Sequence, residues 1–172
     1  MASKTFYMAC LDLDGQQCLV VGEGGMAEEK VAGLEACGGT VRNVLEADYR
    51  PELLDGSFLV IAVTADRALA ERIVADAKER AMLCNIADVP DLCNFILPAI
   101  HRQGPITVGV STGGASPALA KRLRDRIAEI VRPEHAVLAE ELRAMRPEVK
   151  ERFATYAERR DYFEQVVTER LA

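Results

Sequence analysis

Six residues near the N-terminus, GEGGMA at 22–27, have the glycine spacing of a turn that binds phosphate. They follow an apolar run at 17–22 and open a helix predicted over 26–37, which is the context that such a turn requires. Gly22 would make the tight turn, Gly24 would let the backbone approach a pyrophosphate, and the small Ala27 would let helix and strand pack closely. The first N–H groups of the helix would then face the phosphates. The alternative is a strand-to-helix turn with a structural role alone.

Asp88 is the second candidate for chemistry, because it follows a strand predicted over 82–86. In open α/β sheets, ligands bind beyond the carboxyl ends of the strands. The carboxylate would therefore lie near a hydride acceptor bound at the glycine turn, where it could transfer a proton. It could also take a proton from a ligand nitrogen or help to position a metal ion. The alternative is an Asp that caps its own loop.

A third candidate is the loop formed by Ser111, Thr112, Gly113 and Gly114, which joins a predicted strand to a predicted helix. Small residues and hydroxyl groups in such a loop can form a nest that binds an anion. A hinge between two domains is the alternative. Ser116 is the expected N-cap of the following helix, with a proline in its first turn.

Metal-binding signals are weak. The two histidines, His101 and His135, have no partner at ligand spacing, and we expect both to be surface or capping residues. No pair of cysteines forms a C-x-x-C motif, so neither a zinc site nor a redox pair is expected. The five cysteines are Cys10, Cys18, Cys37, Cys84 and Cys93.

The elements that must position these residues alternate between strand and helix, which predicts a parallel sheet covered by helices. Strands are expected at 17–22, 40–45, 58–63 and 82–86, with helices at 26–37 and 66–80 and a short helical piece or turn at 49–56. The later part is predicted to have strands at 95–100 and 106–111 and helices that start near residues 116, 133, 147 and 155.

The second β-α-β unit of this sheet is predicted to be truncated. Only residues 46–57 separate the second strand from the third, which is too short for a full crossover helix with its loops. Dinucleotide sites usually place an acid after the second strand to hold the ribose. Glu46 is the nearest acid here.

Composition excludes several classes of protein. The 172 residues are 49% hydrophobic and carry a net charge of −6, so we expect a folded chain that does not bind nucleic acid. No apolar run is long enough to span a membrane, and residues 1–5 lack the features of a signal peptide, so a cytoplasmic location is expected. Residues 1–100 carry a net charge of −8, whereas residues 101–172 carry +2, and 16 of the 21 basic residues are arginine.

Several blocks together resemble the NAD-dependent precorrin-2 dehydrogenase family, which includes the dehydrogenase and ferrochelatase part of siroheme synthase. The resemblance covers nearly the whole chain. The blocks are LDLDGQQCLVVG at 11–22, AEEK at 27–30, YRPEL at 49–53, LVIAVT at 59–64, CNIAD at 84–88, NFILPAI at 94–100 and VSTGGASPALA at 110–120.

The resemblance implies an NAD-binding Rossmann-like domain at 1–111, a dimerisation region at 112–146 and a small all-helical domain at 147–172. It implies oxidation of precorrin-2 to sirohydrochlorin with hydride transfer to NAD⁺, and in some members insertion of Fe²⁺. Asp88 matches the functional aspartate of the family, and Thr112 matches a serine that carries phosphate in some siroheme synthases. The implied cofactor contacts are Gly22, Gly24, Gly25, Met26 and Thr64. The implied substrate contacts are Asn85, Ser111, Thr112, Gly113 and Gly114.

The implied partners are a tetrapyrrole with eight carboxylates, which suits the arginine-rich second half, and a second copy of the chain in a homodimer. The chain lacks roughly 15 to 20 residues that members of the family have before the YRPE block and that help to hold the adenosine of NAD. Glu46 or Asn43 would take over that role, or NAD binding would be weak. The alternatives are a tetrapyrrole-binding chelatase or carrier that has lost NAD, and a dinucleotide sensor or structural dimer.

Overall fold

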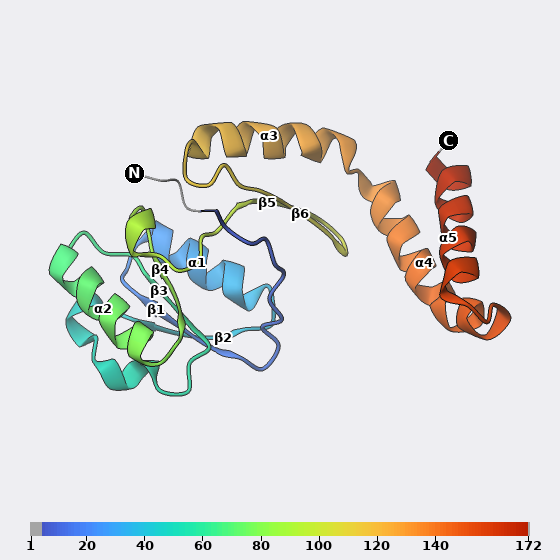
Figure 1. Cartoon of the computed structure of the whole chain (residues 1–172). Coiled ribbons are helices and arrows are strands. Elements are labelled where there is room, and N and C mark those ends of the chain that lie inside the picture. Colours follow the sequence, from blue (N-terminus) through green and yellow to red (C-terminus); the bar gives the residue numbers. More distant parts are fainter. Residues whose placement is uncertain (1–4, 172) are drawn as a thin grey trace. The chain divides into compact units, whose positions relative to one another are not determined.

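The computed structural model describes residues 5–171, so the expectation for the first four residues lies outside the described part. The chain divides into two compact units, Met1–Leu97 and Pro98–Ala172, each of which is described by itself (Figure 1). The functional boundaries predicted at residues 111 and 146 stay predictions. Within residues 5–171, no helix combines the length and the apolar character needed to cross a membrane.

The first unit contains the predicted parallel sheet. Its strands lie in the order β2-β1-β3-β4, and every neighbouring pair is parallel. The strands are β1 (Gln17–Val21), β2 (Thr40–Val44), β3 (Leu59–Ala62) and β4 (Leu83–Ile86). The two central strands, β1 and β3, are almost wholly buried, as their continuous apolar sequences predicted.

Helices cover both faces of this sheet (Figure 1). Successive side chains of a strand point to opposite faces, so Leu19 and Val21 pack with helix α2 (Arg67–Glu79), while Cys18 and Val20 pack with helix α1 (Gly25–Glu35). The fold class predicted from the sequence is therefore confirmed.

The connection between β2 and β3 contains only two short 3₁₀ helices, η1 (Glu46–Asp48) and η2 (Pro51–Leu54). Leu53 and Leu54 of η2 are buried against the same face of the sheet as α2. In the six-stranded dinucleotide-binding order, a further strand would lie beyond β2. Here β2 is the edge of the sheet, so the truncated second unit is confirmed.

At the other edge of the sheet, Asn94 hydrogen-bonds to β4 through both its side chain and its backbone. The Asn94 amide donates to the carbonyl of Met82 over 2.8 Å and accepts from the N–H of Cys84 over 2.8 Å, and its own N–H donates to the carbonyl of Cys84 over 3.1 Å. The strand predicted at 95–100 is wrong in its bounds, because the chain leaves this edge through Pro98 and pairs only from Ala99 onward.

The second unit consists of an antiparallel hairpin and three helices. The elements are β5 (Ala99–Gln103), β6 (Ile106–Val110), α3 (Pro117–Ile130), α4 (Pro133–Arg152) and α5 (Tyr156–Leu171), with η3 (Pro90–Leu92) preceding them in the first unit. Helix α3 contacts both strands of the hairpin. The helix start predicted near Pro147 is wrong, because α4 continues through this exposed proline. Because Pro147 has no N–H, the backbone carbonyl of Arg143 lacks its usual helical donor. Arg143 is exposed, so water can donate to this carbonyl instead.

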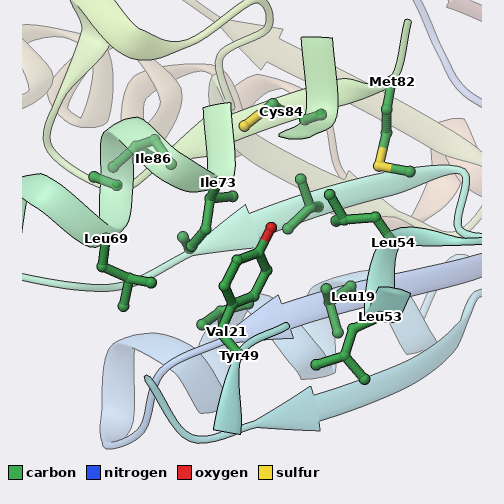
Figure 2. Packing of buried hydrophobic residues seen from close by; sticks show 14 of the residues in the cluster. Leu19, Val21, Tyr49, Leu53, Leu54, Leu69, Ile73, Met82, Cys84 and Ile86 are labelled. Carbon is green, nitrogen blue, oxygen red and sulfur yellow. The ribbon is translucent and has the colours of Figure 1, made fainter. Parts of the chain in front are cut away.

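Tyr49 closes the core on the α2 face. It is 6% exposed, and Figure 2 shows its ring in the same apolar cluster as Val21 and Ile73. Its hydroxyl donates to the Asp76 carboxylate over 2.9 Å, and the Arg72 guanidinium lies 5.4 Å from the centre of its ring. Burial first, and then the hydrogen bond to Asp76, raises the pKa of the Tyr49 hydroxyl above its ordinary value.

Replacing Tyr49 with Phe tests this contact. At pH 7 we expect Tyr49→Phe to lower the free energy of unfolding by about 1 kcal/mol, because Asp76 loses its donor. Above a pH of about 10, Tyr49 ionises in the unfolded chain before it ionises in the folded one. The wild type then loses stability that the variant keeps, so the difference should shrink with rising pH. Urea unfolding over this range measures it, and a constant difference would contradict the raised pKa.

Candidate functional site

The carboxyl ends of three adjacent strands carry the predicted site residues of the first unit. Gly22 follows β1, Thr64 lies two residues beyond β3, and Asp88 lies two residues beyond β4. These strands are parallel neighbours, so their carboxyl ends share one edge of the sheet. At about 4.8 Å per strand, the edge spans about 10 Å from β1 to β4. The structure thus brings these three positions together, while their roles stay predictions.

Gly22 lies where the backbone has no room for a side chain. Its φ is 124°, and a Cβ atom there would lie 2.2 Å from the carbonyl oxygen of Val63. The Gly22 N–H donates to the carbonyl of Val44 over 2.8 Å, and the Asn43 amide donates to the carbonyl of Gly22 over 3.3 Å. Asn43 therefore braces the glycine turn, a contact that the sequence pattern did not reveal.

The N-terminus of α1 is open. Gly24 is its N-cap residue, with a φ of 81° and a ψ of 179°, and no side chain caps the helix. A Cβ atom at Gly24 would meet nothing within 4 Å, so an approaching group finds free space there. Ala27 is fully buried in the core beneath, whereas Met26 is 43% exposed. These features fit the pyrophosphate of a dinucleotide, which needs free N–H groups and close access to the backbone.

Thr64 shapes the neighbouring turn. Its hydroxyl accepts a hydrogen bond from the N–H of Asp66 over 3.0 Å. Asp66 in turn caps α2 by accepting from the N–H groups of Ala68 and Leu69. The N-terminus of α2 is thus capped by a side chain, in contrast to that of α1.

Asp88 is exposed and has a φ of 60°, in the left-handed region that residues other than glycine adopt uncommonly and Asp and Asn adopt more often than most. Its side chain makes no hydrogen bond or ion pair with any residue in the range 5–171. The interpretation of Asp88 as a loop cap is therefore not supported, since a cap such as Asp66 bonds nearby N–H groups. A carboxylate without a partner in the described residues, at the edge where ligands of such sheets bind, makes Asp88 a candidate functional residue.

Glu46 lies at the same edge, two residues beyond β2. It is exposed, and within the described residues its side chain has no partner. Because the amide of Asn43 is bonded to Gly22, Glu46 is the freer of the two groups considered for the ribose.

Asn85 contributes its side chain to the interior. It is 8% exposed, and its amide donates to the carbonyl of Phe95 over 3.0 Å. This bond ties the segment beyond η3 to β4. Contact with a substrate at Asn85 stays a prediction.

The loop from Ser111 to Gly114 belongs to the second unit. The Thr112 hydroxyl donates to the carbonyl of Ser116 and accepts from its N–H, and the Ser111 hydroxyl accepts from the N–H of Gly113. Gly113 and Gly114 both have positive φ, and Ser116 caps α3 as predicted. The hydroxyl groups thus stabilise the loop itself, and a substrate role for these residues stays a prediction.

Histidine and cysteine side chains are used within the fold. His135 caps α4 by accepting from the N–H of Arg132 over 3.0 Å, as predicted. Burial raises the pKa of Cys84 to about 12, which keeps this thiol protonated at neutral pH. Within residues 5–171, no three His, Cys, Asp or Glu side chains are grouped so that they could hold a metal ion.

The parallel sheet, the glycine turn and the open helix N-terminus together define an α/β dinucleotide-binding domain. Residues 9–99, more than half of the chain, match the family described as "Putative NAD(P)-binding". Residues 103–130 match "Sirohaem biosynthesis protein central", and residues 136–172 match "Sirohaem synthase dimerisation region". The chain belongs to the putative NAD(P)-binding family, in the form that continues into these sirohaem synthase regions.

Among curated proteins, the chain is 35% identical over 175 residues to a siroheme synthase of Methylobacillus flagellatus and 34% identical over 181 residues to one of Nitrosococcus oceani. These alignments cover 91% and 94% of the chain but only 38% and 39% of the relatives, so the chain spans about two-fifths of their length. Both alignments are longer than the 172 residues of the chain, so the relatives carry residues that this chain lacks.

Among solved structures, a protein titled "SirC, precorrin-2 dehydrogenase" has a similar fold. The TM-score is 0.74 with 22% sequence identity, over 94% of this chain and 89% of that one. At this identity the likeness supports the fold.

Substitution of the glycines by alanine tests the geometry of the turn. We expect Gly24→Ala to lower the free energy of unfolding by about 1–3 kcal/mol, because its backbone lies in a region that only glycine adopts readily. Gly22→Ala should cost more, because a clash with Val63 adds to the strain. Gly25→Ala is the control, since it has open space and no positive φ. Urea unfolding compares the three, and equal effects of Gly22→Ala and Gly24→Ala would contradict the close approach.

Proposed function

We propose that the chain oxidises precorrin-2 to sirohydrochlorin with NAD⁺ as the hydride acceptor. The observation that carries this proposal is the unpaired carboxylate of Asp88, held at the same sheet edge as the glycine turn. The names of the siroheme synthase relatives and of the dehydrogenase with a similar fold supply the substrate class. We also propose a cytoplasmic location, because the free thiols of Cys18, Cys84 and Cys93 suit a reducing compartment.

The glycine turn holds the cofactor. The N–H groups of Gly24, Gly25 and Met26 bind the pyrophosphate, Thr64 lines the adjacent strand end, and Glu46 binds the ribose hydroxyls. Bound NAD⁺ supplies the site that accepts the hydride.

Asp88 accepts the proton that the oxidation releases. Oxidation of precorrin-2 removes two hydrogens, one as the hydride that passes to NAD⁺ and the other as a proton. The exposed Asp88 carboxylate accepts this proton as the hydride leaves, and then passes it to water. Because no side chain in the described part of the chain is bonded to Asp88, both of its oxygens are available for this transfer.

Arginines of the second unit hold the carboxylates of the substrate. Arg122 and Arg126 lie one turn apart on α3, and both are exposed. Neither forms an ion pair or a hydrogen bond with the described residues, in contrast to Arg124, which is paired with Asp125. A guanidinium group suits forked pairing with a carboxylate. Ser111, Thr112, Gly113 and Gly114, before the start of the same helix, are further proposed substrate contacts of the second unit, and Asn85 is a proposed substrate contact of the first unit.

The activity is tested with purified protein, precorrin-2 and NAD⁺, with NADH absorbance as the signal. We expect NADH to form with the wild type, and Asp88→Asn to lower kcat by about a hundredfold or more, because the amide cannot accept a proton. Asp91→Asn, in the same loop, should keep a rate close to that of the wild type. Absence of NADH with intact substrate would refute the proposed activity. An undiminished rate in Asp88→Asn would remove Asp88 from the mechanism.

A second candidate is a tetrapyrrole chelatase or carrier without NAD chemistry, which the short connection between β2 and β3 favours. Fe²⁺ would then be the second substrate. Its entry into sirohydrochlorin releases two protons, which Asp88 would accept one at a time and pass to water. This candidate predicts tetrapyrrole binding and iron insertion without NADH formation in the same assay. Iron insertion together with NADH formation would indicate both activities.

We also propose that the active form is a homodimer. Helix α5 buries none of its residues, and Tyr156 and Leu171 are 75% and 52% exposed. On α3, Leu119, Leu123 and Ile130 form an exposed apolar stripe. These side chains would leave water in contact with a second copy of the chain. The match to a dimerisation region over residues 136–172 supports the same proposal.

Light scattering coupled to size-exclusion chromatography tests the dimer. We expect a mass of twice 18.8 kDa for the wild type. The double variant Leu123→Glu, Ile130→Glu should shift toward the monomer, because two charges would be buried at the contact. Lys121→Glu, at an exposed position of the same helix, is the control and should leave the dimer intact. A monomeric wild type would refute the proposed dimer.

A further inference from the structure

The thiol of Cys93 closes the loop that presents Asp88. Its sulfur accepts a hydrogen bond from the N–H of Ile86 over 3.2 Å. It lies 3.3 Å from the carbonyl oxygens of both Ile86 and Val89, so its single hydrogen is shared between them or donated to one. These bonds cross from one side of the loop to the other, with Asp88 between Ile86 and Val89.

The surroundings of this sulfur are fixed. Cys93 is 6% exposed, and the Asn85 amide donates to its sulfur over 3.5 Å while also holding the carbonyl of Phe95. The N–H of Cys93 bonds the carbonyl of Pro90 over 3.2 Å, which closes the 3₁₀ turn beneath the loop. The thiol is therefore bonded both to β4, through Asn85 and Ile86, and to the loop, through Val89.

The backbone of Asp88 needs such support. A φ of 60° is less favourable than right-handed backbone even for Asp, which tolerates it better than most residues, so surrounding bonds help to hold it. No side-chain bond of Asp88 contributes to this, since its carboxylate has no partner within residues 5–171. The Val89 N–H donates to the carbonyl of Ile86 over 3.2 Å and closes the turn, and the sulfur of Cys93 adds bonds to the same two residues.

We propose that Cys93 is a positioning residue, whose buried thiol holds the Asp88 loop so that the carboxylate faces the edge that carries the glycine turn. This inference rests on the proposed role of Asp88 in the oxidation. Cys93 does not touch the reacting atoms. It acts by restricting where the carboxylate of Asp88 can lie.

Cys84 offers a matched control. It is also buried, at 3% exposed, and it belongs to the same apolar cluster as Cys93. Its thiol, however, makes no hydrogen bond with the described residues. Cys84→Ala and Cys93→Ala thus remove the same atom from the same core, and only the second removes bonds to the Asp88 loop.

The experiment compares the full-length wild type with Cys93→Ala, Cys93→Ser and Cys84→Ala. Steady-state assays with precorrin-2 and NAD⁺ give kcat and KM, and hydrogen exchange gives the protection of the Ile86 and Val89 amides. We expect Cys93→Ala to lower kcat between about tenfold and a hundredfold with little change in the KM for NAD⁺. The Ile86 amide should exchange faster, because it loses its acceptor. Cys93→Ser keeps a donor and an acceptor, so it should recover most of the kcat and most of the protection of the Ile86 amide. Cys84→Ala should resemble the wild type in both measurements.

The outcomes separate this inference from the proposed function. If the wild type turns over substrate and Cys93→Ala is equally active, the positioning role is overturned. The same holds if Cys93→Ser has as low a kcat as Cys93→Ala. Equal losses in Cys84→Ala and Cys93→Ala would also overturn it, since loss of packing alone would then explain the effect. A wild type without turnover would reject the proposed function, and amide exchange would then decide whether Cys93 holds the loop. Unchanged exchange of Ile86 in Cys93→Ala would reject that as well.

Discussion

The site depends on the close approach of two backbones, at Gly22 and at Val63. The space between them admits no Cβ atom, so β1 can turn into α1 directly beside the end of β3. This approach places the uncapped N-terminus of α1 at the sheet edge, and the small Ala27 lets the helix lie against the strands beneath it. Open N–H groups, the Thr64 turn and Asp88 then lie along one edge because parallel strands end on the same side.

The shortened sheet concentrates this chemistry on few strands. In the described part of the chain no strand lies beyond β2, and the sheet face opposite α1 is covered in part by η2 and by Tyr49, whose hydroxyl is bonded to Asp76. At the other edge, the side chains of Asn94 and Cys93 bond β4 in place of a further strand. Short segments thus complete one face and one edge of the sheet, and the segment at the β4 edge carries Cys93, the residue proposed to hold the Asp88 loop.

The sequence predicted what depends on local patterns. The glycine turn, the capping by Ser116 and the parallel sheet follow from residue spacing, and the structure has all of them. The position of Asp88 at a strand edge was also predictable, because its strand was clear. The positive φ of Asp88 and the absence of a capping bond were not, because an exposed Asp in a loop has the same pattern in either case. The role of Cys93 depends on contacts across the loop, and a single cysteine gives no sign of them. The helix start predicted near Pro147 was wrong because a long helix can tolerate the lost hydrogen bond and the ring contact of one exposed proline, and α4 continues through it.

The most direct test of the central claim is whether the truncated domain binds NAD⁺. A calorimetric titration of NAD⁺ into the purified wild-type chain, with its fold checked by circular dichroism, measures this without requiring the tetrapyrrole. We expect one site per chain with a micromolar dissociation constant. A folded chain that gives no binding heat at millimolar NAD⁺ would contradict the assignment of the glycine turn as a cofactor site.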